Sequence, residues 1–125
     1  TANVVADRLA SHDLPIVFDP VMVATSGSTL ADAETIAAFE RLMRVASVVT
    51  PNTPELEALG GEEAVLAHGS HLLAKGGHTE GKYIVDRVLA PNGREIARLE
   101  GKRFDTEDTH GTGCTLASAL ACGLA

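Results

Sequence analysis

Apolar residues along this chain follow two spacings, one helical and one continuous. In residues 3–12 and 32–44 they recur three or four positions apart, which predicts two amphipathic helices, the second with Asp32 as its N-cap. In the first helix, Val4, Val5 and Leu9 fall on one helical face. Short continuous apolar runs, typical of buried strands, occupy residues 15–18, 46–50 and 71–75. Strands of this kind that alternate with helices predict an α/β fold, a mostly parallel sheet covered by helices.

A helix is predicted directly after the second strand. Thr53 is expected to be its N-cap and Pro54 its first residue, because an N-cap hydroxyl and a proline at the first position suit a helix start. Gly60 and Gly61 are expected to end it, and residues 62–68 could add two turns.

The last third of the chain predicts an antiparallel hairpin followed by a helix. Residues 83–90 and 94–100 flank Pro91-Asn92-Gly93, which predicts an antiparallel hairpin at one edge of the sheet. A final apolar helix is predicted to begin near Thr112.

Polar residues and glycines gather where the predicted strands end. These positions are Asp19, Thr50-Pro51-Asn52 and Lys75-Gly76-Gly77. In open α/β sheets, ligands bind outside the carboxyl ends of the strands. The sequence therefore predicts a binding site at this edge.

Composition narrows the class of protein. The 125 residues suffice for one modest domain, and the net charge of −7 argues against nucleic-acid and anionic-membrane partners. The apolar runs are too short to span a bilayer. Both ends fall within helical patterns, so we expect a piece of a longer protein.

The two cysteines are predicted to be free thiols. Cys114 and Cys122 lie eight residues apart on the last predicted helix, about 12 Å along its axis, which is too far for a disulfide. This predicts a reducing, cytoplasmic compartment. Cys122 is expected to be a small buried residue of the helix.

The stretch "HGTGCT", residues 110–115, carries the first candidate chemistry. A helix start has unpaired N–H groups and partial positive charge, so Gly111 to Cys114 could cradle an oxyanion or a phosphate. The alternative is a glycine turn that leads into a core helix. Cys114 could act as a base or nucleophile at the helix start, or could simply be a small buried residue.

Three strand-end residues and one helix residue offer further candidates. Asn52 and Glu55 could hold Mg²⁺, or Glu55 could serve only as a favourably placed acidic residue in the first turn of the capped helix. Lys75 could contact a phosphate, or could be a solvated strand end. Asp19 could order a metal-bound water or a phosphate-binding lysine, or could be a turn residue.

Four segments carry a family resemblance. They are "FDPVMVATSG" (18–27), "TPNTPELEAL" (50–59), "AKGGH" (74–78) and "THGTGCTLASALA" (109–121). In this combination and order they resemble the hydroxymethylpyrimidine/phosphomethylpyrimidine kinases of thiamine biosynthesis, in the ribokinase-like superfamily. The resemblance covers nearly the whole chain and implies that residues 1–125 are the C-terminal part of a single ribokinase-like kinase domain.

The resemblance implies an enzyme that uses ATP and Mg²⁺. It would phosphorylate 4-amino-5-hydroxymethyl-2-methylpyrimidine and then its monophosphate, giving the diphosphate. Gly111, Thr112, Gly113 and Cys114 would form the anion hole over the transferring phosphate. Cys114 takes the position where most members of the superfamily carry an aspartate base, and it could act as the base or by position alone.

Other site residues follow from the same resemblance. Lys75, Asn52, Thr109 and His110 would contact the nucleotide. Glu55 and Asn52 would act on Mg²⁺, and Val21 and Asp19 would contact the substrate. The resemblance also implies a homodimer that binds the pyrimidine and ATP.

This sequence departs from the family pattern in three ways. Family members are longer, and the part absent here carries a glycine-rich pyrimidine-binding segment and the lid. The segment between Glu62 and His71 is short, and Ser28 stands where an acidic residue is common. Two alternatives stay open: a pyridoxal or pyridoxine kinase of the same superfamily, and a non-catalytic nucleotide-binding fragment.

Overall fold

The structure is a computed structural model that describes residues 1–22, 33–76, 81–104 and 111–125. Helices and strands are named in chain order. They are α1 (Ala2–Leu9), β1 (Val17–Phe18), α2 (Ala33–Val45), β2 (Val48–Val49), α3 (Thr53–Ala58), α4 (Glu62–Leu66), β3 (His71–Ala74), β4 (Tyr83–Leu89), β5 (Glu95–Lys102) and α5 (Thr112–Leu124). The order of predicted elements is confirmed, and most of them are a few residues shorter than predicted.

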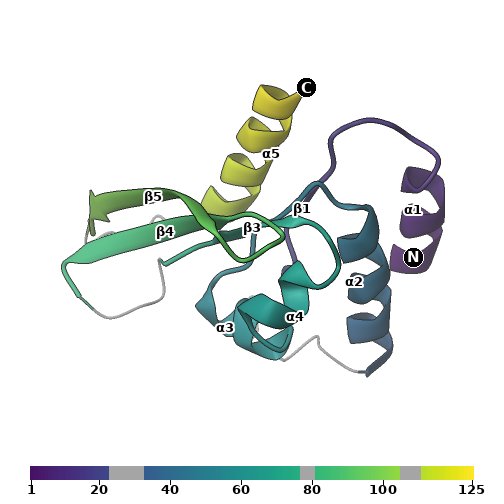
Figure 1. The fold of residues 1–125 in the computed structure, drawn as a ribbon, viewed down its shortest axis with the longest axis horizontal. Helices are drawn as coiled ribbons and strands as arrows, with labels where there is room; N and C mark the ends of the chain where they lie inside the picture. The colour runs from purple at the N-terminus through teal and green to yellow at the C-terminus, as the bar shows by residue number, and fades with distance from the viewer. Residues whose placement is uncertain (23–32, 77–80, 105–110) are drawn as a thin grey trace.

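The strands form one mixed sheet in the order β1-β2-β3-β4-β5. β1, β2 and β3 run parallel, with Val17 opposite Val48 and Val48 opposite His71. β4 pairs antiparallel with both β3 and β5, so β4 and β5 form a hairpin at the far edge (Figure 1). The predicted α/β fold with an antiparallel hairpin at one edge is therefore confirmed.

Helices lie on both sides of the sheet. In Figure 1, α3 and α4 lie below the sheet, α5 rises above it, and α1 lies against the outer side of α2. The core lies between the sheet and helices α2, α3 and α4, and its members include Val49, Leu72 and Val65, all 0% exposed. This arrangement leaves the carboxyl ends of β1, β2 and β3 beside the start of α5.

The start of α3 corrects one prediction. The N-cap is Asn52, not Thr53, and the helix begins at Thr53 with Pro54 second. The Asn52 side chain accepts a hydrogen bond from the Glu55 amide, and the Glu55 carboxylate accepts one from the Asn52 amide. This reciprocal capping box satisfies two backbone donors, which the Thr53 hydroxyl one position later could not do. The predicted N-cap Asp32 lies outside the described residues.

Helical spacing does not determine which helix faces are buried. In α1 only Ala6 is buried, whereas Val4 and Val5 are 63% and 43% exposed. In α5 no residue is buried, and Cys122 is exposed, so the prediction of a buried Cys122 is wrong. Periodicity reports which residues share a face, but only the packing of other elements determines whether that face is covered.

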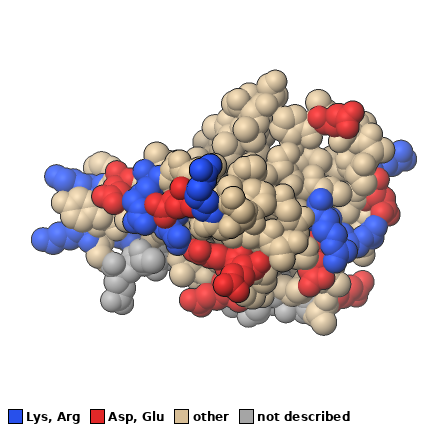
Figure 2. Space-filling view, in the orientation of Figure 1, with Lys and Arg blue, Asp and Glu red and all other residues tan. Residues whose placement is uncertain are grey.

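Charged side chains of both signs are mixed along the hairpin (Figure 2). Glu95 pairs with both Arg87 and Arg98, and Arg87 also pairs with Glu62 at the start of α4. These contacts tie the hairpin to the helical layer. None of the helices described here has the length and apolar character needed to cross a membrane.

Candidate active site

Three strand ends lie side by side at one edge of the sheet. The Thr50 amide donates to the Phe18 carbonyl at 2.9 Å, and the Lys75 amide donates to the Pro51 carbonyl at 2.9 Å. Asn52 and Lys75 then form a parallel bridge. Parallel register thus places the side chains that follow β1, β2 and β3 next to one another, as the sequence predicted.

Asp19 and Lys75 form a sheltered ion pair at this edge. The Lys75 Nζ lies 2.8 Å from Asp19 Oδ1, and the side chains are 15% and 14% exposed. The Thr50 hydroxyl also donates to Asp19 Oδ1, at 2.9 Å. The interpretation of Lys75 as a solvated strand end is therefore wrong. A lysine held by a single carboxylate keeps donors for a further anion.

The first turn of α5 lies over this ion pair. The N-cap, Gly111, has a φ of 77°, a left-handed conformation that glycine adopts without strain, and it has no side chain to cap the helix. A Cβ placed on Gly113 would lie 3.4 Å from Lys75 Nζ and 3.5 Å from Asp19 Oδ2. The start of a helix, with its partial positive charge, is thus in contact with the Asp19–Lys75 pair.

The capping box at Asn52 and Glu55 lies on the other side of the same space. The Asn52 amide lies 2.8 Å from Glu55 Oε2, so Oε1 takes no part in the capping box. Glu55 is 7% exposed. The predicted place of Glu55 in the first turn of the helix is confirmed, and one carboxylate oxygen remains for other contacts.

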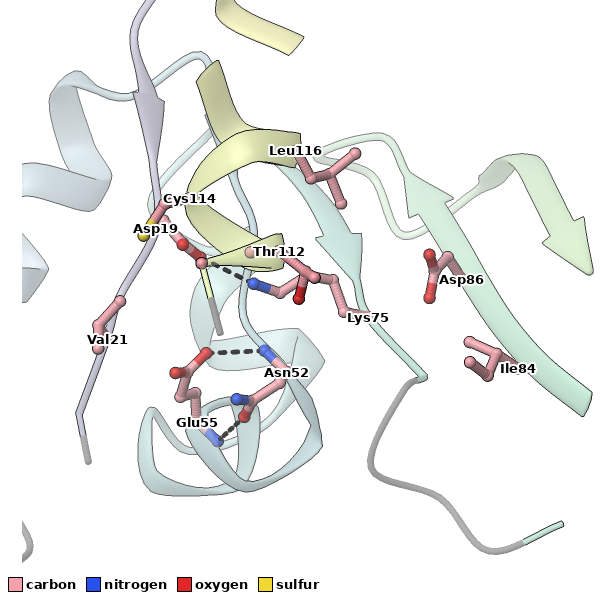
Figure 3. A pocket seen from close by; sticks show the side chains of 12 residues that line it. Asp19, Val21, Asn52, Glu55, Lys75, Ile84, Asp86, Thr112, Cys114 and Leu116 are labelled. Carbon is pink, nitrogen blue, oxygen red and sulfur yellow. Dashed lines mark hydrogen bonds and ion pairs between the residues drawn. The ribbon is translucent and has the colours of Figure 1, made fainter. Parts of the chain in front are cut away.

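These groups line one cavity of about 400 Å³ (Figure 3). Its walls are Asp19, Val21, Asn52, Glu55, Lys75, Ile84, Asp86, Gly111, Thr112, Gly113, Cys114 and Leu116. The structure therefore brings together every described residue that the sequence analysis assigned to the site. Thr109 and His110 lie outside the described residues.

Two predicted residues lie at the open side of this cavity. Val21 is 51% exposed. Cys114 is exposed too, so the interpretation of Cys114 as a small buried residue is wrong. Solvent can therefore reach the side chains of both Val21 and Cys114.

Sequence reasoning missed three residues of the site. Ile84 and Asp86 line the cavity from β4, and Leu116 lines it from α5. Thr50, named only as a strand end, donates a hydrogen bond to the Asp19 carboxylate. Asp86 had a signal, because it is an acidic residue inside an otherwise largely apolar strand pattern, "YIVDRVLA".

The cavity wall at Asn52 and Glu55 carries the oxygen atoms that could bind a metal ion. Among the described residues, no group of three or more His, Cys, Asp or Glu side chains could hold an ion. Glu55 Oε1 and the Asn52 side chain offer oxygen ligands at one wall. Mg²⁺ is commonly held by one or two carboxylates together with substrate phosphates and waters, so this donor set fits Mg²⁺ bound with a phosphate ligand.

Curated relatives match the whole chain. It is 41% identical over 140 residues to a hydroxymethylpyrimidine/phosphomethylpyrimidine kinase of Rhizobium meliloti, a match that covers 100% of this chain and 52% of the relative. It is 44% identical over 135 residues to the enzyme of the same description in Streptomyces coelicolor, covering 97% and 49%. The chain thus spans about half the length of these relatives.

Solved structures agree on the fold. An ADP complex of Bacillus subtilis pyridoxal kinase superposes with a TM-score of 0.80 and 26% identity, over 98% of this chain and 50% of that one. The model of the phosphomethylpyrimidine kinase family matches residues 1–125. Because that match spans the full sequence and the strand ends carry the motifs that suggested it, the chain belongs to the phosphomethylpyrimidine kinase family.

Proposed function

We propose that the full-length protein phosphorylates 4-amino-5-hydroxymethyl-2-methylpyrimidine and its monophosphate with ATP, giving the diphosphate used in thiamine biosynthesis. The observation that carries this proposal is the Asp19–Lys75 ion pair directly beneath Gly113, in a chain of this family. A helix start and a lysine that converge on one cavity suit a transferring phosphoryl group.

Phosphoryl transfer requires positioning and charge stabilisation more than covalent chemistry from the protein. In this proposal, the backbone of residues 111–114 and the Lys75 ammonium contact the oxygens of the transferring group. Asp19 holds Lys75 in place through its 2.8 Å contact. The pyrimidine lies toward Val21, at the exposed side of the cavity.

Glu55 and Asn52 are proposed to bind Mg²⁺ at the opposite wall. Glu55 Oε1 lies outside the capping box, and the Asn52 side chain lies beside it. Mg²⁺ bound there would neutralise negative charge on the phosphate oxygens. The capping box keeps the carboxylate fixed, so Glu55 presents this oxygen at little conformational cost.

Cys114 is proposed to lie next to the reacting hydroxyl. It is exposed in the first turn of α5, beside the Asp19–Lys75 pair. It could accept the proton of the alcohol. It could also act by position alone, because proton loss can come late in a loose transition state.

We further propose that residues 1–125 form the C-terminal part of one kinase domain. The relatives extend well beyond the matched region. Apolar residues of α5 also lie exposed, among them Leu116 at 40% and Leu124 at 43%. The remaining family segment would cover this surface and complete the pyrimidine pocket. A cytoplasmic homodimer without nucleic-acid or membrane partners is part of the proposal.

A coupled assay of ADP release by the full-length protein tests the substrate. We expect turnover with hydroxymethylpyrimidine and little with pyridoxal. Turnover with pyridoxal alone would replace this proposal by the second candidate, a pyridoxal kinase, which the 26% identity to the Bacillus subtilis pyridoxal kinase favours. Turnover with neither substrate, while ADP still binds, would indicate a non-catalytic nucleotide-binding protein.

A further inference from the structure

Asp86 is an acidic residue on an apolar face of the sheet. It lies on β4 two positions from Ile84, so both side chains are on the same side of the strand, and both line the cavity beneath α5. Figure 3 shows the two side chains on β4, across the cavity from Val21. A half-buried carboxylate beside Ile84 and Leu116 loses hydration and therefore requires a hydrogen-bond donor.

The donor is a backbone amide at the end of the neighbouring strand. The Gly76 N–H donates to Asp86 Oδ1 at 2.8 Å. The antiparallel pairing of β3 and β4 extends as far as Ala74 opposite Arg87, two residues before Gly76. Gly76 also lies so close to β4 that a Cβ there would collide with the Val85 carbonyl oxygen. The hydrogen bond to Asp86 thus attaches the chain to β4 two residues beyond the end of β3.

This contact holds the segment that carries Lys75. On one side, the Lys75 amide donates to the Pro51 carbonyl at 2.9 Å. On the other side, Gly76, the next residue, is bound to Asp86. The Lys75 backbone is therefore fixed between β2 and β4, and its side chain reaches Asp19 from that fixed point.

We propose that Asp86 is a positioning residue for Lys75. Through the Gly76 amide it holds the end of β3 in the place where the Lys75 ammonium meets both Asp19 and the first turn of α5. A carboxylate acceptor makes this a charge-assisted hydrogen bond, stronger than one to a neutral group. The effect on turnover rests on the proposed kinase function, whereas the effect on Gly76 does not.

The first test measures hydrogen exchange of the Gly76 amide by NMR in the ligand-free full-length protein. We expect Asp86→Ala to raise the exchange rate at least about tenfold, in line with loss of a hydrogen bond to a charged group. Asp86→Asn retains an acceptor oxygen and should stay within about threefold of the parent protein. Glu100→Ala, on the exposed strand β5, is the matched control and should leave Gly76 unchanged. An unchanged Gly76 rate in Asp86→Ala would overturn the inference.

The second test measures turnover of the same variants. We expect Asp86→Ala to lower kcat at least about tenfold and Asp86→Asn to restore most of it. In a Lys75→Ala background, Asp86→Ala should add little further loss, because residues that act through one another are not additive. Full additivity, or equal losses in the Ala and Asn variants, would overturn the positioning role.

The two tests also cover a variant that does not fold and a parent protein that has no kinase activity. If Asp86→Ala fails to fold, Asp86→Leu keeps the apolar packing next to Ile84 and lacks the acceptor, and both measurements are made on it. If the parent protein has no kinase activity, the proposed function fails, and the Gly76 exchange rate still decides the inference.

Discussion

The Lys75 ammonium lies 2.8 Å from the Asp19 carboxylate, and the two residues come from strand ends 56 positions apart in the sequence. The pair is sheltered, with both side chains about one-seventh exposed, and the Thr50 hydroxyl is its only other described side-chain partner. Lys75→Ala is expected to lower the free energy of unfolding of the full-length protein by about 1.5–3 kcal/mol, because the sheltered Asp19 carboxylate loses its charged donor and keeps only the Thr50 hydroxyl.

A double-variant cycle separates the pair from its surroundings. Asp19→Asn with Lys75→Met should destabilise the protein by less than the sum of the two single changes, since no unpaired charge is left behind. The measurement is urea unfolding of all four proteins. Strict additivity would show that the two charges do not interact in solution.

Gly113 is expected to tolerate no side chain in the active protein. Its Cβ position is in van der Waals contact with Lys75 Nζ and Asp19 Oδ2, so a methyl group would cover the ion pair where an anion should approach. Gly113→Ala should lower kcat/KM for ATP at least about tenfold, and Gly113→Val should abolish turnover. Circular dichroism should show both variants folded.

A glycine in the same helix supplies the control for that change. Apart from the backbone of its own helix and its chain neighbours, no described residue has an atom within 4 Å of the Cβ position of Gly123. Gly123→Ala should leave turnover unchanged and stabilise α5 by about 0.5–1 kcal/mol. Equal losses of activity in Gly113→Ala and Gly123→Ala would contradict the proposed role of the first turn of α5 in binding the phosphoryl group.

Glu55 is expected to serve two separable purposes. Glu55→Gln keeps an oxygen for the Asn52 amide and should change stability by less than about 1 kcal/mol. It removes the carboxylate charge, so the Mg²⁺ concentration that gives half-maximal activity should rise about tenfold or more. Glu55→Ala should show the same activity loss and also destabilise α3. An unchanged Mg²⁺ dependence in Glu55→Gln would place the metal elsewhere.

The hairpin should weaken in acid. Hydrogen bonds from Arg98 first, and then from Arg87, lower the pKa of Glu95 from 4.5 to about 2. A carboxylate with a lower pKa in the folded state stabilises that state above about pH 4.5 and loses this contribution as the pH falls toward 2. The protection of β4 and β5 amides, measured relative to their intrinsic exchange rates, should therefore fall as the pH drops between these values, and Glu95→Gln should remove that loss of protection. A pH profile identical in parent and variant would contradict the assignment.

Ser70 offers a stabilising change. Its side chain is 1% exposed, and within the described part of the chain its hydroxyl has no hydrogen-bond partner. Removing a buried hydroxyl without a partner should be neutral or should stabilise the protein, so Ser70→Ala is expected to raise the free energy of unfolding by up to about 1 kcal/mol. Thermal unfolding checks this. A loss above 1 kcal/mol would mean that the hydroxyl is bonded in the full-length protein.

The sequence by itself determined the order of elements and the place of the site. Short apolar runs that alternate with helical spacing define a parallel sheet, and parallel strands bring their carboxyl ends to one edge. Asp19, Asn52 and Lys75 follow those runs directly, so their proximity could be predicted without coordinates. Local chemistry also located the start of α3 and the place of Glu55 in its first turn, although it assigned the N-cap to Thr53 one residue too late.

Only the tertiary structure decided which side chains meet and which surfaces are covered. The contacts of Lys75 with Asp19, and of Asp86 with Gly76, depend on register between strands, which no local pattern encodes. The exposure of Cys114, Cys122 and the apolar side of α5 depends on what packs against that helix. Sequence spacing fixes the direction of a side chain relative to its own helix or strand, whereas burial and pairing are set by elements distant in the chain.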